Sequence, residues 1–259
     1  AQQRARGAIT YSSGNHALGV GQAARLLGSS ALIVMPGDVP SAKMAAVRQL
    51  GCHIETFDRD TENSDAVVER LRAETGRIIV PPSADPQVLA GAGTAALELH
   101  EQAQDLGAQL DAVLVPCGGG GLTAATAVVM RALSPDTSVY AVEPELFDDT
   151  RRSLEAGTRL ANPTGRRTIC DAIMTPIPND MTFPINLDLL QGGLIASDAA
   201  VRVAMRFAFE NFKLVVEPGA AVGIAAILCG AIDIKGKTIA TVATGGNIDP
   251  ARFCELVNV

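Results

Sequence analysis

Apolar positions along the chain fall into short runs, separated by longer stretches with helical periodicity. A short run of β-branched and aliphatic residues bounded by glycine, proline or polar residues predicts a buried strand. The longer stretches are rich in alanine and leucine, which favour helices. The expected strands span 8–11, 31–35, 53–57, 77–80, 111–116, 138–142, 213–216 and 237–243. The expected helices span 17–27, 41–50, 63–75, 86–106, 122–130, 147–156, 182–190, 198–211 and 218–229.

Strands and helices that alternate in this way predict an α/β fold with parallel sheets and right-handed crossovers. We expect two open parallel sheets with flanking helices, one in a small domain of residues 7–83 and one in a large domain of residues 84–259. Ligands of such sheets bind beyond the carboxyl ends of the strands. The sequence therefore predicts a ligand cleft between the two domains.

Three polar or glycine-rich loops directly follow predicted strands: Ser12 to His16, Gly118 to Gly121, and Thr244 to Asn247. Four consecutive glycines cost backbone entropy, which indicates positive φ angles and a close approach of backbone N–H groups to a ligand. The run also opens a predicted helix, whose N-terminal amides and dipole attract anions such as phosphate. The alternatives are a structural turn for the glycines and ordinary helix capping by Ser12 and Asn15.

Composition narrows the class of protein. With 259 residues, 47% of them hydrophobic, the chain can bury a large core. Its five cysteines are scattered and form no C-x-x-C pair, which indicates reduced thiols rather than disulfides or a zinc site. A formal net charge of −7 and 3% aromatic residues argue against a nucleic-acid surface. Because neither a membrane-spanning run nor a leader is evident, we expect a cytoplasmic protein that acts on small molecules.

One interpretation of the glycine loop is a dinucleotide site. Gly118 and Gly120 open a helix, and Glu143 ends the next strand at a spacing where an acid could bind the ribose of NAD. Against it, Thr123 occupies the third glycine position, and the other two polar loops are left without a role. The other interpretation uses all three loops.

Seven motifs carry a family resemblance: YSSGNHALG, PSAKMAAVRQLG, LAGAGTAALEL, VPCGGGGLTAA, AVEP, VVEPGAA and ATGGN. In order and spacing they resemble the serine/threonine dehydratase and serine racemase family of pyridoxal-phosphate enzymes, which have fold type II. The resemblance spans essentially the whole chain. It implies a fold like that of the tryptophan synthase β subunit, with pyridoxal 5′-phosphate bound between the small and large domains.

The resemblance also implies a set of site residues. It places Asn15 at the pyridine 3-hydroxyl and Thr244 at the ring nitrogen. A neutral hydroxyl there leaves the nitrogen unprotonated, which limits the ring as an electron sink and suits β-elimination. The cofactor phosphate is expected on the backbone amides of Gly118, Gly119, Gly120, Gly121 and Leu122. The substrate carboxylate is expected to bind Ser12, Ser13, Gly14, Asn15 and His16.

The implied activity is that of an ammonia-lyase, or dehydratase, on L-serine, L-threonine or related hydroxyamino acids such as β-hydroxyaspartate. Loss of the α-proton and the β-hydroxyl would release a keto acid and ammonia. Ser13 keeps serine racemase activity open, because racemases of the family carry a serine there as the acid/base of the opposite face. Its structural alternative is a serine at the start of a helix. His53 and His100 are expected to be structural or exposed.

A cation site is a further expectation. Serine racemases hold Mg²⁺ or Ca²⁺ with two carboxylates and a backbone carbonyl, which correspond here to Glu143, Asp149 and the carbonyl of Phe147. Oxygen ligands of this kind select a hard cation. The alternative is that these acids cap the following helix and face water.

The family holds its cofactor through a Schiff-base lysine upstream of the Ser12 to His16 loop, in a segment that would precede Ala1. The lysines of the sequence are Lys43, Lys213, Lys235 and Lys237, and none matches that position. We therefore expect an N-terminally incomplete sequence without the C-terminal regulatory domain of biosynthetic threonine deaminases. The alternative is a lysine-less relative that binds a ligand without catalysis.

Two expectations about the whole protein follow from the resemblance. The 259 residues alone should release no keto acid, whereas a longer gene product should be an active dehydratase. We also expect the protein to form a homodimer. Its small-molecule substrate is expected to be an amino acid.

Overall fold

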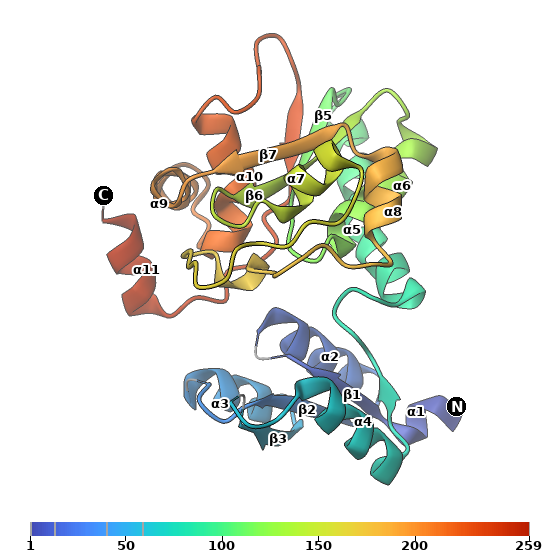
Figure 1. Cartoon of the computed structure of the whole chain (residues 1–259). Helices are drawn as coiled ribbons and strands as arrows, with labels where there is room; N and C mark the ends of the chain where they lie inside the picture. The colour runs from blue at the N-terminus through green and yellow to red at the C-terminus, as the bar shows by residue number, and fades with distance from the viewer. Residues whose placement is uncertain (1, 13, 40, 59, 259) are drawn as a thin grey trace. The chain divides into compact units, whose positions relative to one another are not determined.

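The computed structural model describes residues 2–12, 14–39, 41–58 and 60–258 (Figure 1). The chain divides into two compact units, Ala1–Asp85 and Pro86–Val259. Each unit contains a four-stranded sheet whose strand pairs are all parallel. The expected α/β class with two parallel sheets and flanking helices is therefore confirmed.

Unit 1 is a sheet covered by helices on both faces. Its strands, in the order β3-β2-β1-β4, are β1 (Ala8–Tyr11), β2 (Ala31–Pro36), β3 (His53–Phe57) and β4 (Ile78–Ile79). Its helices are α1 (Gln2–Arg6), α2 (Asn15–Leu26), α3 (Ser41–Gln49) and α4 (Ser64–Thr75). Side chains of β2 alternate between the faces, so Ile33 and Met35 pack with α2 and α3, whereas Leu32 and Val34 pack with α4.

Unit 2 repeats this plan on a larger scale (Figure 1). Its strands, in the order β7-β6-β5-β8, are β5 (Ala112–Pro116), β6 (Ser138–Pro144), β7 (Gly192–Ala196) and β8 (Ile239–Thr241). Its α-helices are α5 (Pro86–Asp105), α6 (Gly121–Leu133), α7 (Asp149–Ala156), α8 (Phe183–Leu189), α9 (Asp198–Phe207), α10 (Pro218–Leu228) and α11 (Pro250–Val257). A 3₁₀ turn, η1 (Asp171–Ile173), and a π-helical turn, η2 (Ala208–Phe212), complete it.

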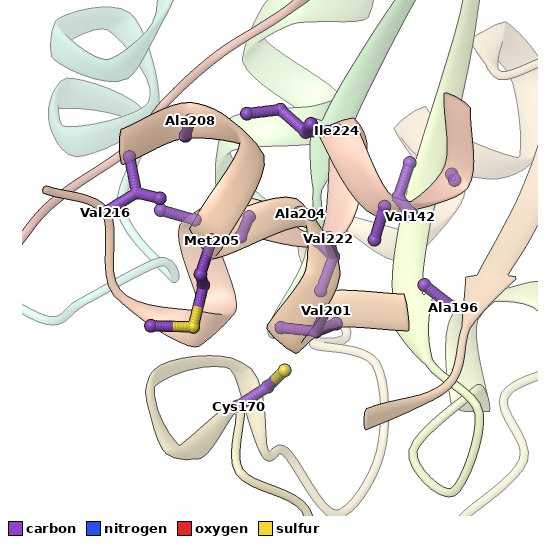
Figure 2. Packing of buried hydrophobic residues seen from close by; sticks show 14 of the residues in the cluster. Val142, Cys170, Ala196, Val201, Ala204, Met205, Ala208, Val216, Val222 and Ile224 are labelled. Carbon is purple, nitrogen blue, oxygen red and sulfur yellow. The ribbon is translucent and has the colours of Figure 1, made fainter. Parts of the chain in front are cut away.

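The two faces of the unit 2 sheet bury separate cores. Val113 and Val115 of β5 pack with α5 and α6. Leu114 points to the other face, toward a larger cluster that includes α9, α10 and α11. Figure 2 shows part of that cluster, with Val201 and Met205 of α9 near Cys170. The helix α10 is buried along almost its whole length, which suits its composition of alanine, glycine and valine.

Both sheets share one topology. In each, the first strand of the unit lies between the second strand and the last one. The chain therefore moves outward from β1 or β5 and finally returns to the opposite side of that strand. The carboxyl end of such a strand is a topological switch point, where open α/β sheets bind their ligands. The loop Ser12 to His16 follows β1 and the loop Gly118 to Gly121 follows β5.

The structure differs from the sequence-based prediction at two strands. The segment 213–216 was expected to form a strand, but it is an irregular segment that follows η2. The segment Gly192–Ala196 forms the edge strand β7, which the sequence pattern did not predict because two glycines begin it. A Cβ on Gly193 would lie 2.6 Å from the Cβ of Arg151, so the glycine lets α7 pack closely on β7.

The remaining differences are small or concern helix ends. The chain also ends in helix α11, which no predicted element covered. Among the described residues, no helix is both long and apolar enough to cross a membrane.

Candidate cofactor-binding site

The glycine loop connects β5 to α6 in unit 2. The amide of Cys117 still belongs to the sheet, because it donates to the carbonyl of Val142 at 2.9 Å. The amide of Ala124 already belongs to the helix, because it donates to the carbonyl of Gly120 at 3.0 Å. Gly120 itself has φ +82°, in the left-handed region, which reverses the chain between strand and helix.

Between these two points lies a row of amides without internal acceptors. Within the part of the chain that the structure describes, none of the amides from Gly118 to Thr123 donates a hydrogen bond. They lie at the N-terminus of a 13-residue helix, where the dipole adds positive potential. Unpaired amides and the dipole together are suited to an anion such as phosphate.

The carbonyls of Gly119 and Gly120, in contrast, accept hydrogen bonds from side chains, two of which belong to the α8 region. The hydroxyl of Thr182 donates to the carbonyl of Gly119 at 2.7 Å. The carbonyl of Gly120 accepts from the side-chain amide of Asn186 at 3.2 Å and from the hydroxyl of Thr123 at 2.9 Å. Thr182, Asn186 and Thr123 are all buried.

The loop after β8 begins at the carboxyl end of the sheet, as the glycine loop does. Leu114 of β5 pairs in register with Thr241 of β8, and the Thr241 hydroxyl donates to the Leu114 carbonyl at 2.8 Å. Thr244, three positions beyond the end of β8, is exposed. The carbonyl of Gly245 accepts from the Glu217 amide at 3.0 Å, which fixes the loop to the start of α10. The glycine loop and Thr244 thus flank the switch point of this sheet.

The third loop lies at the corresponding switch point of unit 1. The Ser12 amide donates to the Val34 carbonyl at 3.1 Å, and the Ser12 hydroxyl accepts from the Gly14 amide at 3.2 Å. Asn15 begins α2 and is exposed. Ser13, the candidate racemase acid/base, lies outside the described residues. The structure therefore shows a polar loop at the carboxyl end of β1 and leaves the role of Ser13 as a prediction.

His16 has a structural contact in this loop. Its Nε2 is 2.9 Å from the carbonyl of Val80, which requires that Nε2 carries the proton and donates. Val80 follows β4, so the bond joins the start of α2 to the neighbouring strand. Burial lowers the pKa of His16, although the Val80 carbonyl partly opposes this effect. His53 is exposed on β3, and His100 is partly buried on α5.

Two acids are buried beside the end of β6. Glu143 is fully buried, and its two carboxylate oxygens accept from the amides of Thr150 at 2.9 Å and Arg151 at 2.8 Å. The Glu143 carboxylate therefore caps the N-terminus of α7, where a negative charge is favourable. Burial, followed by the nearby charge of Asp149, raises the pKa of Glu143 to about 8.

Asp149 is only half satisfied. Its Oδ1 accepts from the side chain of Asn162 at 2.6 Å, whereas its buried Oδ2 has no hydrogen-bond partner among the described residues. Burial raises the pKa of Asp149 to about 6. Both acids are buried, so the part of the alternative in which they face water is wrong, whereas capping of the following helix is confirmed for Glu143. Within the described residues, no group of three or more His, Cys, Asp or Glu side chains could hold a metal ion.

The lysines lie on other parts of the chain. Lys235 and Lys237 precede β8 and so lie at the amino end of the sheet, opposite to the glycine loop. Lys213 has φ +58° at the end of η2, and its Nζ donates to the Glu210 carbonyl at 2.6 Å. Lys43 lies on α3 in unit 1.

Sequence reasoning missed the side chains that bind the glycine loop and Asp149. Thr182 and Asn186 were predicted only as part of a helix, and Asn162 as part of a loop. Thr182 followed by Pro184 is a helix-start signal, which could have identified its position at the N-cap. No local signal shows that its hydroxyl reaches Gly119, because 63 residues separate the two.

The chain is similar to several known proteins. Residues 1–245 match the family described as pyridoxal-phosphate dependent enzyme. The chain is 40% identical over 255 residues to an L-threo-3-hydroxyaspartate ammonia-lyase of Pseudomonas sp, covering 98% of this chain and 78% of that protein. It is 35% identical over 256 residues to serine racemase of Schizosaccharomyces pombe, covering 99% and 78% of the two chains.

A solved structure is similar as well. The crystal structure of a T.th. threonine deaminase superposes with a TM-score of 0.88 at 43% identity, covering 95% of this chain and 79% of that one. The unpaired amides of the glycine loop suit the phosphate of the cofactor for which the family is named. The chain therefore belongs to the family of pyridoxal-phosphate-dependent enzymes, with ammonia-lyases and serine racemases among its relatives.

Proposed function

We propose that this protein is an ammonia-lyase for L-β-hydroxy-α-amino acids and that 3-hydroxyaspartate is its preferred substrate class. The observation that carries the proposal is the row of amides from Gly118 to Thr123, which have no acceptor in the described part of the chain and open helix α6. Such a row is suited to the phosphate of pyridoxal phosphate. When bound, this cofactor supplies an electron-withdrawing ring that stabilises negative charge at the substrate Cα.

The chain's own residues hold and orient the two ligands in this proposal. The amides of Gly118 to Leu122 bind the phosphate, and Thr244 offers its hydroxyl to the ring nitrogen. Asn15 binds the 3-hydroxyl, and the loop Ser12 to His16 binds the substrate carboxylate. Ser13 is the proposed acid/base for a serine racemase side activity. A neutral hydroxyl at the ring nitrogen favours elimination over reactions that need a stronger electron sink.

The substrate class rests on the relatives. The relative at 40% identity is named for L-threo-3-hydroxyaspartate, whereas the serine racemase is 35% identical. The carboxylate at Cβ distinguishes hydroxyaspartate from serine and threonine, and a charge-assisted hydrogen bond to it would give selectivity. Threonine and serine are then slower substrates of the same site.

The test uses the natural polypeptide that contains these residues. Ammonia release is measured with L-threo-3-hydroxyaspartate, L-threonine and L-serine, and chiral chromatography of the remaining serine reports racemisation. We expect kcat/KM to be at least about tenfold higher for hydroxyaspartate, the equivalent of one charge-assisted contact. Equal or higher kcat/KM for threonine would contradict the assigned substrate class. Failure to release ammonia from all three would contradict the proposed reaction.

The phosphate site has its own test. Replacing Gly119 and Gly120 by valine should abolish retention of pyridoxal phosphate, because two side chains would cover the amides and Gly120 has a positive φ. Absorbance of the cofactor after gel filtration measures retention. Gly192→Ala is the control, because a Cβ at Gly192 meets no atom within 4 Å. Normal retention in the double variant would place the phosphate elsewhere.

A second proposal concerns a divalent cation. The buried Asp149 Oδ2 without a partner and the fully buried Glu143 carboxylate support a Mg²⁺ or Ca²⁺ site completed by the carbonyl of Phe147. Two buried acids this close repel each other when both are ionised, and a cation would relieve that repulsion.

Thermal melts in EDTA and in added MgCl₂ or CaCl₂ test the cation site. We expect the cation to raise Tm of the parent protein and to leave Tm of Asp149→Ala unchanged. Asp65→Ala, which removes an acid near the start of α4 in unit 1, is the control and should respond like the parent. A parent Tm that does not respond to either cation would remove the proposal.

We also infer a homodimer in the cytoplasm. Support for the dimer comes from unit 2, which exposes Phe209, Phe212, Leu214 and Val215 along one short stretch of chain. Light scattering on the purified natural polypeptide measures the mass, and cell fractionation measures the location. A monomer at micromolar concentration, or a membrane-bound pool, would contradict the corresponding part.

A further inference from the structure

We propose that Thr182 and Asn186 of the α8 region are positioning residues, which aim the amides of Gly120 and Gly121 at the bound phosphate. This inference rests on the proposed cofactor site. Neither side chain touches the face of the loop where the phosphate would lie, because both bind the loop carbonyls. They act through the peptide planes of the glycine loop.

The planarity of the peptide bond supplies the first step. In a trans peptide the C=O and the N–H of the same unit point in opposite directions. The carbonyl of Gly119 shares a plane with the amide of Gly120, and the carbonyl of Gly120 shares one with the amide of Gly121. The hydroxyl of Thr182 holds the first carbonyl at 2.7 Å, and the side-chain amide of Asn186 holds the second at 3.2 Å. Both amides must therefore point away from α8.

The second step is that glycine is needed for this arrangement. A Cβ on Gly120 would lie 2.5 Å from the Nδ2 of Asn186 and 2.9 Å from the Oγ1 of Thr182. The two side chains therefore fill the space behind the loop. With φ +82°, Gly120 also turns successive amides toward a common point, which is the geometry of an anion-binding nest.

The third step concerns the burial of Asn186. Only 1% of its surface is exposed, and its Oδ1 has no hydrogen-bond partner among the described residues. A buried amide oxygen without a partner destabilises the fold, and an apolar residue would avoid that cost. The side-chain NH₂ group of Asn186, which donates to the Gly120 carbonyl, is therefore what an apolar residue at this position could not replace.

Among the described residues, Thr182 is the one donor to the Gly119 carbonyl, so without it that glycine peptide can rotate, because glycine has access to both signs of φ. The Gly120 carbonyl also accepts from the Ala124 amide and the Thr123 hydroxyl, so loss of Asn186 removes one of its three donors and loosens that peptide less. A rotated peptide would present a carbonyl, rather than an amide, to the phosphate. Each lost hydrogen bond should then weaken phosphate binding roughly two- to tenfold, the range that corresponds to one such bond. Binding of a ligand without the phosphate should not change.

The experiment compares two probes on the 259-residue protein. Dissociation constants of pyridoxal 5′-phosphate and of pyridoxal, which lacks the phosphate, are measured by isothermal titration calorimetry. Thr182→Val and Asn186→Leu remove one donor each. We expect each variant to weaken pyridoxal 5′-phosphate by roughly two- to tenfold and to leave pyridoxal unchanged. Thr182→Ser keeps the hydroxyl and should restore the parent affinity.

Thr126→Val is the matched control. Thr126 is fully buried in α6, the helix that follows the glycine loop. Its hydroxyl has no hydrogen-bond partner among the described residues. The substitution therefore makes the same chemical change as Thr182→Val without removing a hydrogen bond. It should leave the affinity for both probes unchanged.

A second measurement does not depend on variants that bind weakly or fold poorly. The amide proton shifts of Gly120 and Gly121 are followed by NMR while inorganic phosphate is added to the parent protein and to Thr182→Ser. Both amides should shift downfield in both proteins. Unmoved amides in a protein that binds phosphate would contradict the inference.

The outcomes separate this inference from the proposed function. If the parent protein binds pyridoxal 5′-phosphate no better than pyridoxal, the phosphate site itself is wrong. If the parent shows the preference and both variants keep it, the site stands and the positioning role is wrong. If the variants weaken both probes equally, the two side chains only stabilise the fold and the inference fails.

Discussion

Gly120 is the residue on which the geometry of the glycine loop depends. Its positive φ turns the chain, and the space where a side chain would begin is filled by Asn186 and Thr182. Backbone conformation and packing therefore both exclude a Cβ at this position. The four-glycine run predicted this requirement, whereas its contacts behind the loop come from residues distant in sequence.

Gly120→Ala should destabilise unit 2 by about 2–4 kcal/mol, the sum of left-handed strain and overpacking. The shift of the urea unfolding transition measures this. Gly91→Ala is the control, because Gly91 lies within α5 and a Cβ there meets no atom within 4 Å. It should stabilise the helix by about 0.5–1 kcal/mol. Equal effects of the two substitutions would contradict the importance of the Gly120 conformation.

His16 makes stability depend on pH. Burial lowers its pKa in the folded protein, so the folded state binds a proton less readily than the unfolded chain does. The stabilisation from His16 is therefore complete above the unfolded pKa of about 6.5. It is lost as pH falls below that value toward the folded pKa.

Unfolding of the parent and of His16→Gln at pH 7.5 and pH 5.5 tests this. Glutamine keeps an N–H that can reach the Val80 carbonyl but does not titrate, so the variant should lose less stability on acidification than the parent. His53→Gln, at an exposed position on β3, should behave like the parent. A parallel loss of stability in the parent and in His16→Gln would show that other groups cause the pH dependence.

The contact between α7 and β7 decides how the edge of the unit 2 sheet forms. Gly193 lies so close to the helix that a Cβ would be 2.7 Å from the Cα of Arg151. Neighbouring Gly192 has open space around it. Arg151 in turn donates its backbone amide to Glu143, so the helix cannot move away without disturbing a buried bond.

Gly193→Ala should therefore destabilise the protein by about 1–3 kcal/mol through overpacking against backbone. Gly192→Ala, in the same strand, should change stability by no more than about 0.5 kcal/mol. Thermal unfolding of the two variants measures the difference. The close packing assigned to α7 and β7 would be wrong if both alanines were tolerated equally.

The same strand shows where sequence patterns stop predicting elements. The strands around the glycine loop were predicted because their apolar runs are buried on both faces, as in Val113 to Val115. Gly192 and Gly193 look like a turn in the sequence, but they pair with Tyr140 and Ala141 of β6, and the packing of α7 needs a glycine at position 193. The segment 213–216 has strand-like composition but lacks a neighbouring strand with which to pair.

Helix starts were more predictable than the contacts between elements. Asp249 caps α11 by accepting from the amides of Ala251 and Arg252, and Pro250 follows it at the first helical position. This local signal could have predicted the missed helix. At the candidate site, the sequence identified the loops that follow strands, because their glycines and polar residues are local features. It could not identify Thr182, Asn186 or Asn162, whose roles depend on tertiary contacts.

At the scale of the whole molecule, each unit has its own buried cores. Leu71 is 7% exposed in a cluster whose members all belong to unit 1, and fully buried Met205 belongs to a cluster confined to unit 2. Truncation of either residue to alanine should remove about 2–5 kcal/mol from its own unit.

Hydrogen exchange measured strand by strand distinguishes the units. Leu71→Ala should accelerate exchange in β1 and β2 and leave β5 and β6 unchanged, whereas Met205→Ala should do the reverse. Leu106→Ala, at a position that is 83% exposed, should change neither set of amides. Equal acceleration in both sheets from either core variant would show that the units unfold as one.

The strand order of unit 2 has a consequence for how the protein is made. β5 lies beside β8, and the bond that joins Leu114 to Thr241 spans 127 residues. At ~5–20 residues per second, the ribosome needs on the order of 10 s to deliver the partner of β5. Until residues 239–241 emerge, one edge of the central strand lies open and is available to chaperones. In unit 1, by contrast, the last strand that pairs with β1 is complete at residue 79. The sheet of unit 1 can therefore form completely before β8, the last strand of the unit 2 sheet, has been synthesised.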